Sequence, residues 1–419
     1  MDNIIEIQSE KTIPVGYKHT ELGMIPEDWD VSPLAKHTLF VGSGKTNTKS
    51  KGSFPLFGST GQIGSCLNPE YDGDAILIAR VGANAGKLSF VSGQYGVSDN
   101  TIIVKLKPQN NIHFFKYWLT YQNLNSLVFG SGQPLITGTQ LKELLLPVPY
   151  INEQTAIANV LSDTDALLTG LEQLIAKKQA IKTATMQQLL TGRTRLPLFS
   201  KHPDSTHKSY KTSELGLIPE DWECDKLGSL AKIQRGASPR PIDSPIWFDR
   251  NSSVGWLRIS DVSKTKKYLT NTTQSLSELG IAHSRFVPVN NLVMSICATV
   301  GKPIITKKDL CIHDGFVVFN GLSVDQDYMY YVLKNLEHKW GNQGQTGSQM
   351  NLNTDLINET LVLIPSKQEE QTAIATILSD MDAELAVLDK RLAKARDIKQ
   401  GMMQQLLTGR IRLPLDHQP

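Results

Sequence analysis

The chain has 419 residues and a mass of 46.4 kDa, which is too long for one ordinary domain and predicts two or three. Apolar residues make up 40% and charged residues 20%, so the chain can build packed cores and is not wholly disordered. A formal charge of +2, from 43 Lys and Arg against 41 Asp and Glu, excludes a basic coat over the whole chain but not a local patch for nucleic acid.

The cysteines and the N-terminus indicate where the protein works. The four cysteines form no Cys-x-x-Cys pair, which argues against a disulfide scaffold or a zinc knuckle and favours a reducing compartment. No apolar run reaches the roughly 18 residues of a membrane span. Residues 1–10 lack the apolar core of a signal peptide. We therefore expect a cytoplasmic protein with no membrane partner.

The chain contains an internal repeat. Residues 17–29 and 210–222 agree at ten of 13 positions, and both end in Ile-Pro-Glu-Asp-Trp. Residues 153–198 and 370–415 agree at 29 of 46 positions. A period near 200 residues is too long for a solenoid. It predicts two copies of a domain plus an arm, related by a pseudo-twofold axis as in a fused dimer.

The blocks between the repeated segments are largely unlike each other, and both mix strand and helix signals. In the first block we expect strands at 75–79, 88–91 and 101–106 and a helix at 112–127. In the second block we expect strands at 292–296 and 316–319 and a helix at 327–336. Glycine–lysine turns at Gly86-Lys87 and Gly301-Lys302 correspond loosely between the blocks.

Residues 151–191 and 367–408 read as long helices, each ending at a Thr-Gly pair. Apolar residues at spacings of three and four form the seam of a coiled coil on both. The seam consists of Ile157, Leu161, Leu168, Leu171 and Ile175 in the first helix and Ile374, Leu378, Met381, Leu385, Leu388 and Leu392 in the second. Lys178 and Lys182 interrupt it in the first helix, and Lys399 interrupts it in the second. The pattern predicts that the two arms pair with each other; an ordinary core helix is the alternative.

Two motifs resemble nucleotide or base sites only in part. Gly42–Thr46 resembles the end of a phosphate-binding loop, but its first glycine is replaced by Leu39. A polar loop that faces an anion, such as a DNA phosphate, fits better. Asn68–Tyr71 resembles the Asn-Pro-Pro-Tyr loop of adenine methyltransferases but lacks the second proline, so a turn before a strand fits better.

Two further groups have the residue types of a metal site but not its arrangement. Asp327, Glu337 and Lys339 resemble a nuclease set only faintly, because they fall mostly within a predicted helix, whereas nuclease carboxylates normally lie on strands. Cys297, Cys311 and His313 lack a fourth ligand, so buried core cysteines are the better interpretation. We therefore expect no catalytic residue, no metal site and no cofactor site in this chain.

Basic and amide side chains in the loops of both blocks are candidates for DNA contact. Arg and Lys bind phosphate and guanine, and Asn and Gln read adenine. The candidates are Lys45, Arg80, Asn84, Lys87, Gln133 and Thr137 in the first block and Arg235, Arg240, Arg258, Lys302, Gln345 and Gln349 in the second. Each alone is an ordinary surface residue, so the hypothesis depends on several of them lying together.

The repeat resembles the specificity subunit of type I restriction–modification systems. The residues that carry this resemblance are Gly23–Trp29 with Gly216–Trp222, Pro149–Gln154 with Pro365–Gln371, and Gln187–Gly192 with Gln404–Gly409. It covers nearly the whole chain. Tyr150 and Ser366 stand where the family often has proline, which blurs only the start of each arm.

The resemblance implies an α+β fold, with two mixed α/β target-recognition domains separated by two long antiparallel coiled-coil helices. It also implies a non-catalytic subunit that reads a split, asymmetric double-stranded DNA site, one half per domain, while the arms fix the unread gap. Two modification subunits, which bind S-adenosylmethionine and methylate adenine, would dock on the arms. Restriction subunits that use ATP and Mg²⁺ would join them.

The expected boundaries follow the repeat. They are a tail at 1–16, target-recognition domain 1 at 17–150, arm 1 at 151–192, a linker at 193–209, target-recognition domain 2 at 210–366, and arm 2 with a C-terminal tail at 367–419. Two other functions stay open from the sequence: a self-contained DNA methyltransferase or nuclease, and a coiled-coil scaffold unrelated to DNA. An orphan or silent specificity subunit is a third possibility within the family.

Overall fold

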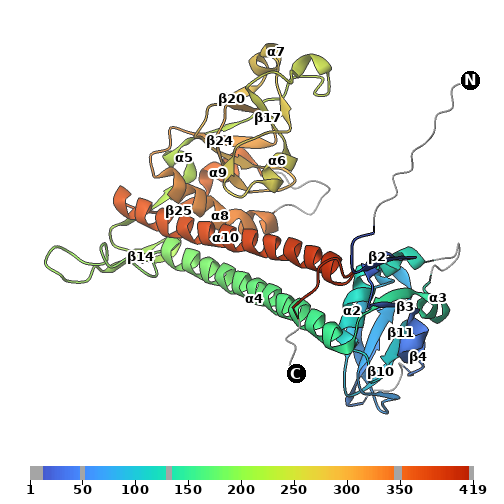
Figure 1. Cartoon of the computed structure of the whole chain (residues 1–419). Helices are drawn as coiled ribbons and strands as arrows, with labels where there is room; N and C mark the ends of the chain where they lie inside the picture. Colours follow the sequence, from blue (N-terminus) through green and yellow to red (C-terminus); the bar gives the residue numbers. More distant parts are fainter. Residues whose placement is uncertain (1–12, 48–51, 129–134, 344–351, 415–419) are drawn as a thin grey trace, which may run out of the picture. The chain divides into compact units, whose positions relative to one another are not determined.

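The computed structural model describes residues 13–47, 52–128, 135–343 and 352–414. The chain forms two compact units, coloured along the sequence in Figure 1. Unit 1 comprises Met1–Gln173 and Asp389–Pro419, and unit 2 comprises Leu174–Leu388. Each unit therefore contains one variable block and a piece of both long helices. Among the described residues, no helix is both long enough and apolar enough to cross a membrane.

Unit 1 places two four-stranded sheets beside short helices. Their strand orders are β6-β5-β10-β7 and β4-β11-β8-β9, and the pairs β1-β2 and β3-β12 lie outside them. The strands are β1 Tyr17–Thr20, β2 Gly23–Pro26, β3 Asp30–Pro33, β4 Thr38–Ser43, β5 Phe54–Gly58, β6 Gly61–Cys66, β7 Tyr71–Asp72, β8 Ala75–Ala79, β9 Leu88–Val91, β10 Gln94–Val97, β11 Thr101–Leu106 and β12 Leu145–Val148. The helices are α1 Leu34–His37, η1 Gly82–Asn84, α2 Ile112–Tyr121, η2 Leu124–Leu127 and α3 Gly138–Glu143.

Unit 2 repeats this plan with a five-stranded sheet, β16-β24-β21-β22-β18, and a four-stranded one, β19-β17-β23-β20. The strands are β13 Tyr210–Ser213, β14 Gly216–Pro219, β15 Trp222–Lys226, β16 Lys232–Arg235, β17 Gly255–Leu257, β18 Tyr268–Leu269, β19 Gln274–Ser275, β20 Arg285–Val287, β21 Leu292–Ser295, β22 Pro303–Thr306, β23 Leu310–Ile312, β24 Phe316–Asn320 and β25 Leu361–Pro365. The helices are α5 Leu227–Leu230, η3 Pro245–Trp247, α6 Ile259–Lys264, α7 Glu278–Ala282, α8 Gln326–Gln343 and α9 Thr354–Glu359.

The expected strands are confirmed, and the two glycine–lysine turns correspond. Gly86 lies between β8 and β9 and Gly301 between β21 and β22, and both have the left-handed φ that glycine adopts most readily. The expected helix at 112–127 is wrong in its length. It ends at Tyr121 because Asn123 has a φ of 47°, and only a short 3₁₀ turn follows. The second helix is longer than expected, since α8 runs to Gln343.

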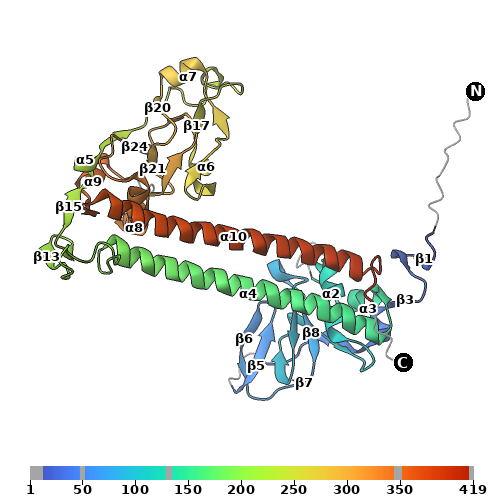
Figure 2. The same ribbon diagram turned by 60° about the vertical axis from the view of Figure 1, so that its left-hand side comes forward.

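The two arms are the helices α4 Ile151–Leu190 and α10 Gln368–Leu406. In each unit a piece of α4 lies beside a piece of α10 and runs the opposite way (Figure 2). In unit 1, Arg396 pairs with Glu172; in unit 2, Lys178 pairs with Glu384. The apolar seam residues are mostly buried or half-buried along both helices. The expected long helices and their antiparallel pairing within each unit are therefore confirmed.

The repeated Pro-Glu-Asp-Trp motif is held to the arms by one arginine, as unit 2 shows. The side chain of Arg195 is only 6% exposed and donates to Glu370 Oε1 over 2.7 Å and to Asp221 Oδ1 over 2.8 Å. Glu370, 1% exposed, also accepts a hydrogen bond from Trp222 Nε1 at 3.3 Å. Lys208 Nζ adds an ion pair to Asp221 at 2.6 Å. We call this set the clamp of unit 2.

Unit 1 has the same clamp, built from the equivalent residues, except that Val15 stands at the position of Lys208. Arg412 donates to Glu153 Oε2 over 2.6 Å and to both carboxylate oxygens of Asp28 over 2.9 Å. Trp29 Nε1 donates to Glu153 over 3.0 Å. The segment that follows each arm thus closes on the domain that begins the other repeat. Chain segments that are far apart in sequence therefore hold each domain to the arms.

A second contact between domain and arm also occurs twice, at Lys182 and Lys399, two of the three lysines that interrupt the seam. Tyr117 donates to Asp165 of α4 over 2.7 Å, and Lys399 Nζ pairs with the same carboxylate at 2.5 Å. In unit 2, Tyr331 and Lys182 make these contacts with Asp382 of α10. Lys182 and Lys399 are therefore partners of a tyrosine–aspartate pair at the domain–arm contact, whereas Lys178 pairs with Glu384 of the other arm.

Candidate nucleic-acid interface

Strand pairing in unit 2 gathers basic side chains at one end of β23. Because β23 runs parallel to β17, the carboxyl ends of both strands lie at the same edge of the sheet. Arg258 follows the last residue of β17, and His313 follows Ile312, the last residue of β23. On the other side of β23, Arg285 of β20 pairs with Ile312. Two guanidinium groups and an imidazole are therefore brought to this edge.

The turn after β23 adds two more arginines around Asp314. Arg235 Nε donates to the carbonyl oxygen of Asp314 over 2.6 Å. Arg240 Nη2 lies 3.4 Å from the Asp314 carboxylate, and Arg285 donates to the carbonyl oxygen of Arg235. With Arg258, four arginines lie around the turn that carries one carboxylate. This edge, which we call the arginine edge, carries a surplus of positive charge.

The charges at the arginine edge do not depend on pH near neutrality. Burial lowers the pKa of His313 and, with the positive charge of Arg258, outweighs the nearby Asp314 carboxylate, which would raise it, so the imidazole is largely neutral at pH 7. Burial alone would raise the pKa of Asp314. A hydrogen bond from Ser238, the charges of Arg240 and Arg235 and, once it is protonated at acidic pH, His313 outweigh burial, so the net effect lowers that pKa. The arginines therefore set the charge that a ligand meets.

A polar cavity of about 790 Å³ opens beside Arg258. Arg250, Gln274 and Asp243 also line it, together with hydroxyl groups from β19 and the loop before it. Within the described part of the chain, the guanidinium groups of Arg250 and Arg258 have no hydrogen-bond partner. Free guanidinium donors suit phosphate oxygens or the acceptor pair of a guanine edge.

Unit 1 has a related but smaller basic edge after β10, which pairs in parallel with β5. Arg80 Nη1 donates to Ser43 Oγ over 2.8 Å and lies 3.4 Å from the carbonyl oxygen of Asp99. Asp99 follows β10 as Asp314 follows β23. Lys45 and Lys87 are exposed or half-exposed, and neither forms an ion pair with a described residue. The two edges thus occupy equivalent places in the fold but differ in their side chains.

Some predicted contact residues have structural partners instead of free donors. Thr137 caps α3 by accepting a hydrogen bond from the Gln140 backbone, in a capping box with the Gln140 side chain. Lys302 Nζ donates to the carbonyl oxygen of Ser263 over 3.0 Å. Asn84 lies in the 3₁₀ turn η1 beside Lys87. Gln133, Gln345 and Gln349 lie outside the described residues.

Arg285 is a member of the arginine edge that sequence reasoning missed. It opens a three-residue strand and has no neighbouring motif. Only the pairing of β20 with β23 brings it beside Arg235. Arg285 can therefore be assigned to this edge only from the order of the strands in the sheet, which a local sequence pattern does not predict.

The motifs that resembled other sites have ordinary structural roles. Thr46 is buried and donates to Glu70, so its hydroxyl does not face a phosphate. Asp327 pairs with Lys267 at 2.9 Å, and Glu337 pairs with Lys334 on the same helix. Burial raises the pKa of Cys311 to about 12, so this thiol stays protonated. Among the described residues, no three His, Cys, Asp or Glu side chains lie together as metal ligands.

Comparisons with known proteins agree with this architecture. A family model described as the type I restriction modification DNA specificity domain matches residues 27–183 and 219–395, together well over half of the chain. The MjaVIII specificity subunit of Methanocaldococcus jannaschii is 26% identical, over 93% of this chain and 94% of its own. The putative MjaX specificity subunit of the same organism is 27% identical, over 95% of this chain and 97% of its own.

Solved structures share the fold. The S subunit of a type I restriction–modification system from M. genitalium gives a TM-score of 0.57 at 17% identity, over 90% of this chain and 96% of that one. The family model matches twice, once around each variable block, as the internal repeat requires. The chain therefore belongs to the type I restriction–modification DNA specificity family, with two target-recognition domains.

Proposed function

We propose that this chain reads a bipartite, asymmetric site in double-stranded DNA, with one half-site contacted by each unit. The observation that carries the proposal is the pair of basic edges at equivalent places in two otherwise similar units. Their side chains differ: four arginines lie around the turn that carries Asp314, whereas Arg80 contacts Asp99, and Lys45 and Lys87 lie in loops of the same unit. Different donors in the same frame suit two different half-sites.

The chain itself supplies recognition, and partner subunits supply the chemistry. We expect two modification subunits, which bind S-adenosylmethionine and methylate adenine, and restriction subunits that use ATP and Mg²⁺, all in the cytoplasm. The family membership and the duplicated arms support this assignment. The arms would set the unread gap between the half-sites, as protein geometry sets half-site spacing in other DNA-binding proteins.

An exchange of one variable block tests the division of labour. Cells that carry the cognate modification subunit would express the chain with residues 30–150 replaced by the same block of another specificity subunit. Methylome sequencing should show one half-site changed and the other retained. A change in both half-sites, or a methylated motif that persists when the gene is deleted and no second specificity subunit is present, contradicts the proposal.

Substitutions at the arginine edge test which side chains read DNA. Arg258→Met and Arg285→Met should each relax one position of a single half-site, and loss of a bidentate contact should weaken binding about 5- to 150-fold. Arg391→Met, on an exposed face of α10, is the matched control because it removes the same charge away from the edge. Equal effects of all three changes would indicate general charge attraction instead of base reading. Turnover by the purified chain alone with S-adenosylmethionine or Mg²⁺ would favour a self-contained enzyme.

A further inference from the structure

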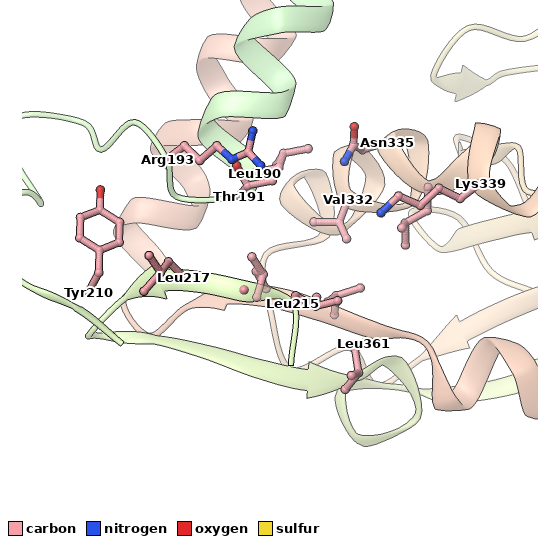
Figure 3. Close-up of a pocket in the computed structure, with 14 residues that line it drawn as sticks. Leu190, Thr191, Arg193, Tyr210, Leu215, Leu217, Val332, Asn335, Lys339 and Leu361 are labelled. Atoms are coloured by element: carbon pink, nitrogen blue, oxygen red, sulfur yellow. The ribbon is translucent and has the colours of Figure 1, made fainter. Parts of the chain in front are cut away.

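Unit 2 contains a hollow of about 720 Å³ between the end of α4, the β13–β14 hairpin, α8 and β25 (Figure 3). Its floor is apolar and includes Leu190, Val332 and Leu363, which are buried. Its rim contains exposed apolar side chains of the hairpin: Leu215 is 49% exposed and Leu217 is 69% exposed. Apolar side chains so exposed around a concavity are typical of a surface that a partner covers.

The rim also has a definite charge. Arg193 and Lys339 line the hollow, both are exposed, and neither forms an ion pair with a described residue. No Asp or Glu is among the described residues that line it. A ligand that covers the floor therefore meets two unpaired cations beside an apolar surface. Carboxylates next to an apolar segment complement both features.

The internal repeat shows that the hairpin side of this hollow is not a feature of the variable block. Leu215 and Arg193 have identical counterparts in the other repeat, Leu22 and Arg410. These counterparts are also exposed, with Leu22 at 39%. Tyr210 likewise matches Tyr17, and each tyrosine donates to the carbonyl oxygen of the glycine that follows a long helix.

Packing in a core does not explain why exposed residues are identical in the two repeats. Exposed residues in the middle of the arms have diverged, as at Leu174 and Arg391 or at Gln179 and Arg396. At the hairpin and the arm end, the exposed residues Leu215 and Arg193 are the same in both repeats, although the proposed DNA-reading edges differ. A ligand that contacts both copies in the same way explains this retention, whereas two different half-sites do not.

We infer that this hollow, and the matching surface at Leu22 and Arg410 in unit 1, dock an apolar, carboxylate-bearing segment of a protein that binds this chain in two copies. The inference rests on the proposed function, under which that protein is the modification subunit. It locates the attachment at the hairpin and the arm end, within each unit. Each end would hold one copy independently of the DNA sequence that its unit reads.

The test uses the full chain purified with its cognate modification subunit, with stoichiometry measured by native mass spectrometry. Leu215→Glu places a carboxylate against the carboxylates expected of the partner and should weaken attachment at that end at least about 100-fold, which leaves one bound copy. Leu22→Glu should remove the other copy, and the double variant should bind none. Leu279→Glu is the matched control, since Leu279 is 48% exposed on α7 and does not line the hollow.

A second pair of variants separates charge from folding. Arg193→Glu should lower the affinity at that end as Leu215→Glu does, and Arg193→Lys should retain it. Two bound copies of the modification subunit in the Leu215→Glu and Arg193→Glu complexes would overturn the inference. If these complexes also bound DNA more weakly, DNA would be the occupant of the hollow. If the unaltered chain binds no modification subunit, the proposed function itself fails.

Discussion

Replacement of the two clamp arginines by methionine should destabilise the two units to different extents. Arg195 is 6% exposed and pairs with Glu370, which is 1% exposed. Arg195→Met leaves that carboxylate buried without its main partner, so we expect a loss of about 3–4 kcal/mol. The Arg412 side chain is 39% exposed, so we expect water to reach Glu153 when Arg412 is replaced. Arg412→Met should therefore lower the free energy of unfolding by only about 1–2 kcal/mol.

Differential scanning calorimetry can resolve the two effects because each clamp lies within one unit. For a unit of this size, 1 kcal/mol shifts the melting temperature by roughly 2–4 °C. Arg195→Met should lower one transition by roughly 6–16 °C, and Arg412→Met should lower the other by roughly 2–8 °C. A single shared transition that both variants lower equally would contradict the assignment of each clamp to its own unit.

A double variant checks that the buried, unpaired carboxylate causes the loss. Glu370→Gln removes the charge but still accepts a hydrogen bond from Trp222 Nε1. Arg195→Met with Glu370→Gln should therefore be more stable than Arg195→Met alone, by about 1–3 kcal/mol. If the double variant is less stable than Arg195→Met, burial of an unpaired charge is not the cause and the reasoning fails.

The same clamp predicts how the stability of unit 2 depends on pH. Burial alone would raise the pKa of Asp221, but hydrogen bonds and charge from Arg195 and Lys208 outweigh it and lower this pKa to about 2. A lowered folded-state pKa gives stability that is fully present above the ordinary value near 3.9 and is lost as the pH falls toward about 2. Thermal unfolding between about pH 5 and pH 2 should show this fall, and Arg195→Met should flatten it.

Four further substitutions should lower stability through local contacts. Gly192→Ala and Gly409→Ala should each destabilise by more than about 1 kcal/mol, because φ is 68° and 67° and the added Cβ would meet a proline ring at 2.5 and 2.3 Å; thermal melts measure this. Tyr331→Phe removes a 2.7 Å hydrogen bond to a carboxylate of α10 and should cost about 1–3 kcal/mol in the same assay. Lys267→Met should lower the melting temperature of unit 2, since its ammonium is buried among three tyrosine rings at 4.6 to 5.2 Å; an unchanged melt would contradict that role.

Much of the architecture can be predicted from the sequence because the same motifs and helix patterns occur in both repeats. The arms carry a seam with regular spacing, and the strand at Ala75–Ala79 is a continuous apolar run, so local periodicity is enough. The helix expected to reach residue 127 stops before Asn123, which adopts the left-handed conformation that asparagine tolerates better than most residues. Asn125, just beyond, donates to the carbonyl oxygen of Ala85 and holds the chain there.

The candidate site is harder to predict because its parts meet only through folding. Arg235 and Arg240 are recognisable as basic loop residues, but nothing local says that both turn to Asp314. Arg285 escapes prediction for the same reason. Thr137 has a residue type that suits DNA contact, and the structure uses it as a helix cap. Residue type alone does not separate a free donor from one that already has a partner.

The clamps are separate from the edges that we propose to read DNA. Asp28, Trp29, Glu153 and Arg412 all lie in repeated segments, and so do their counterparts in unit 2. The attachment of each domain to the arms therefore uses no residue of its reading edge. Substitutions at sites that share no partner have nearly additive effects on stability. Under the proposed function, substitutions in the arginine edge can therefore change the preferred half-site while the clamp still holds the domain to the arms.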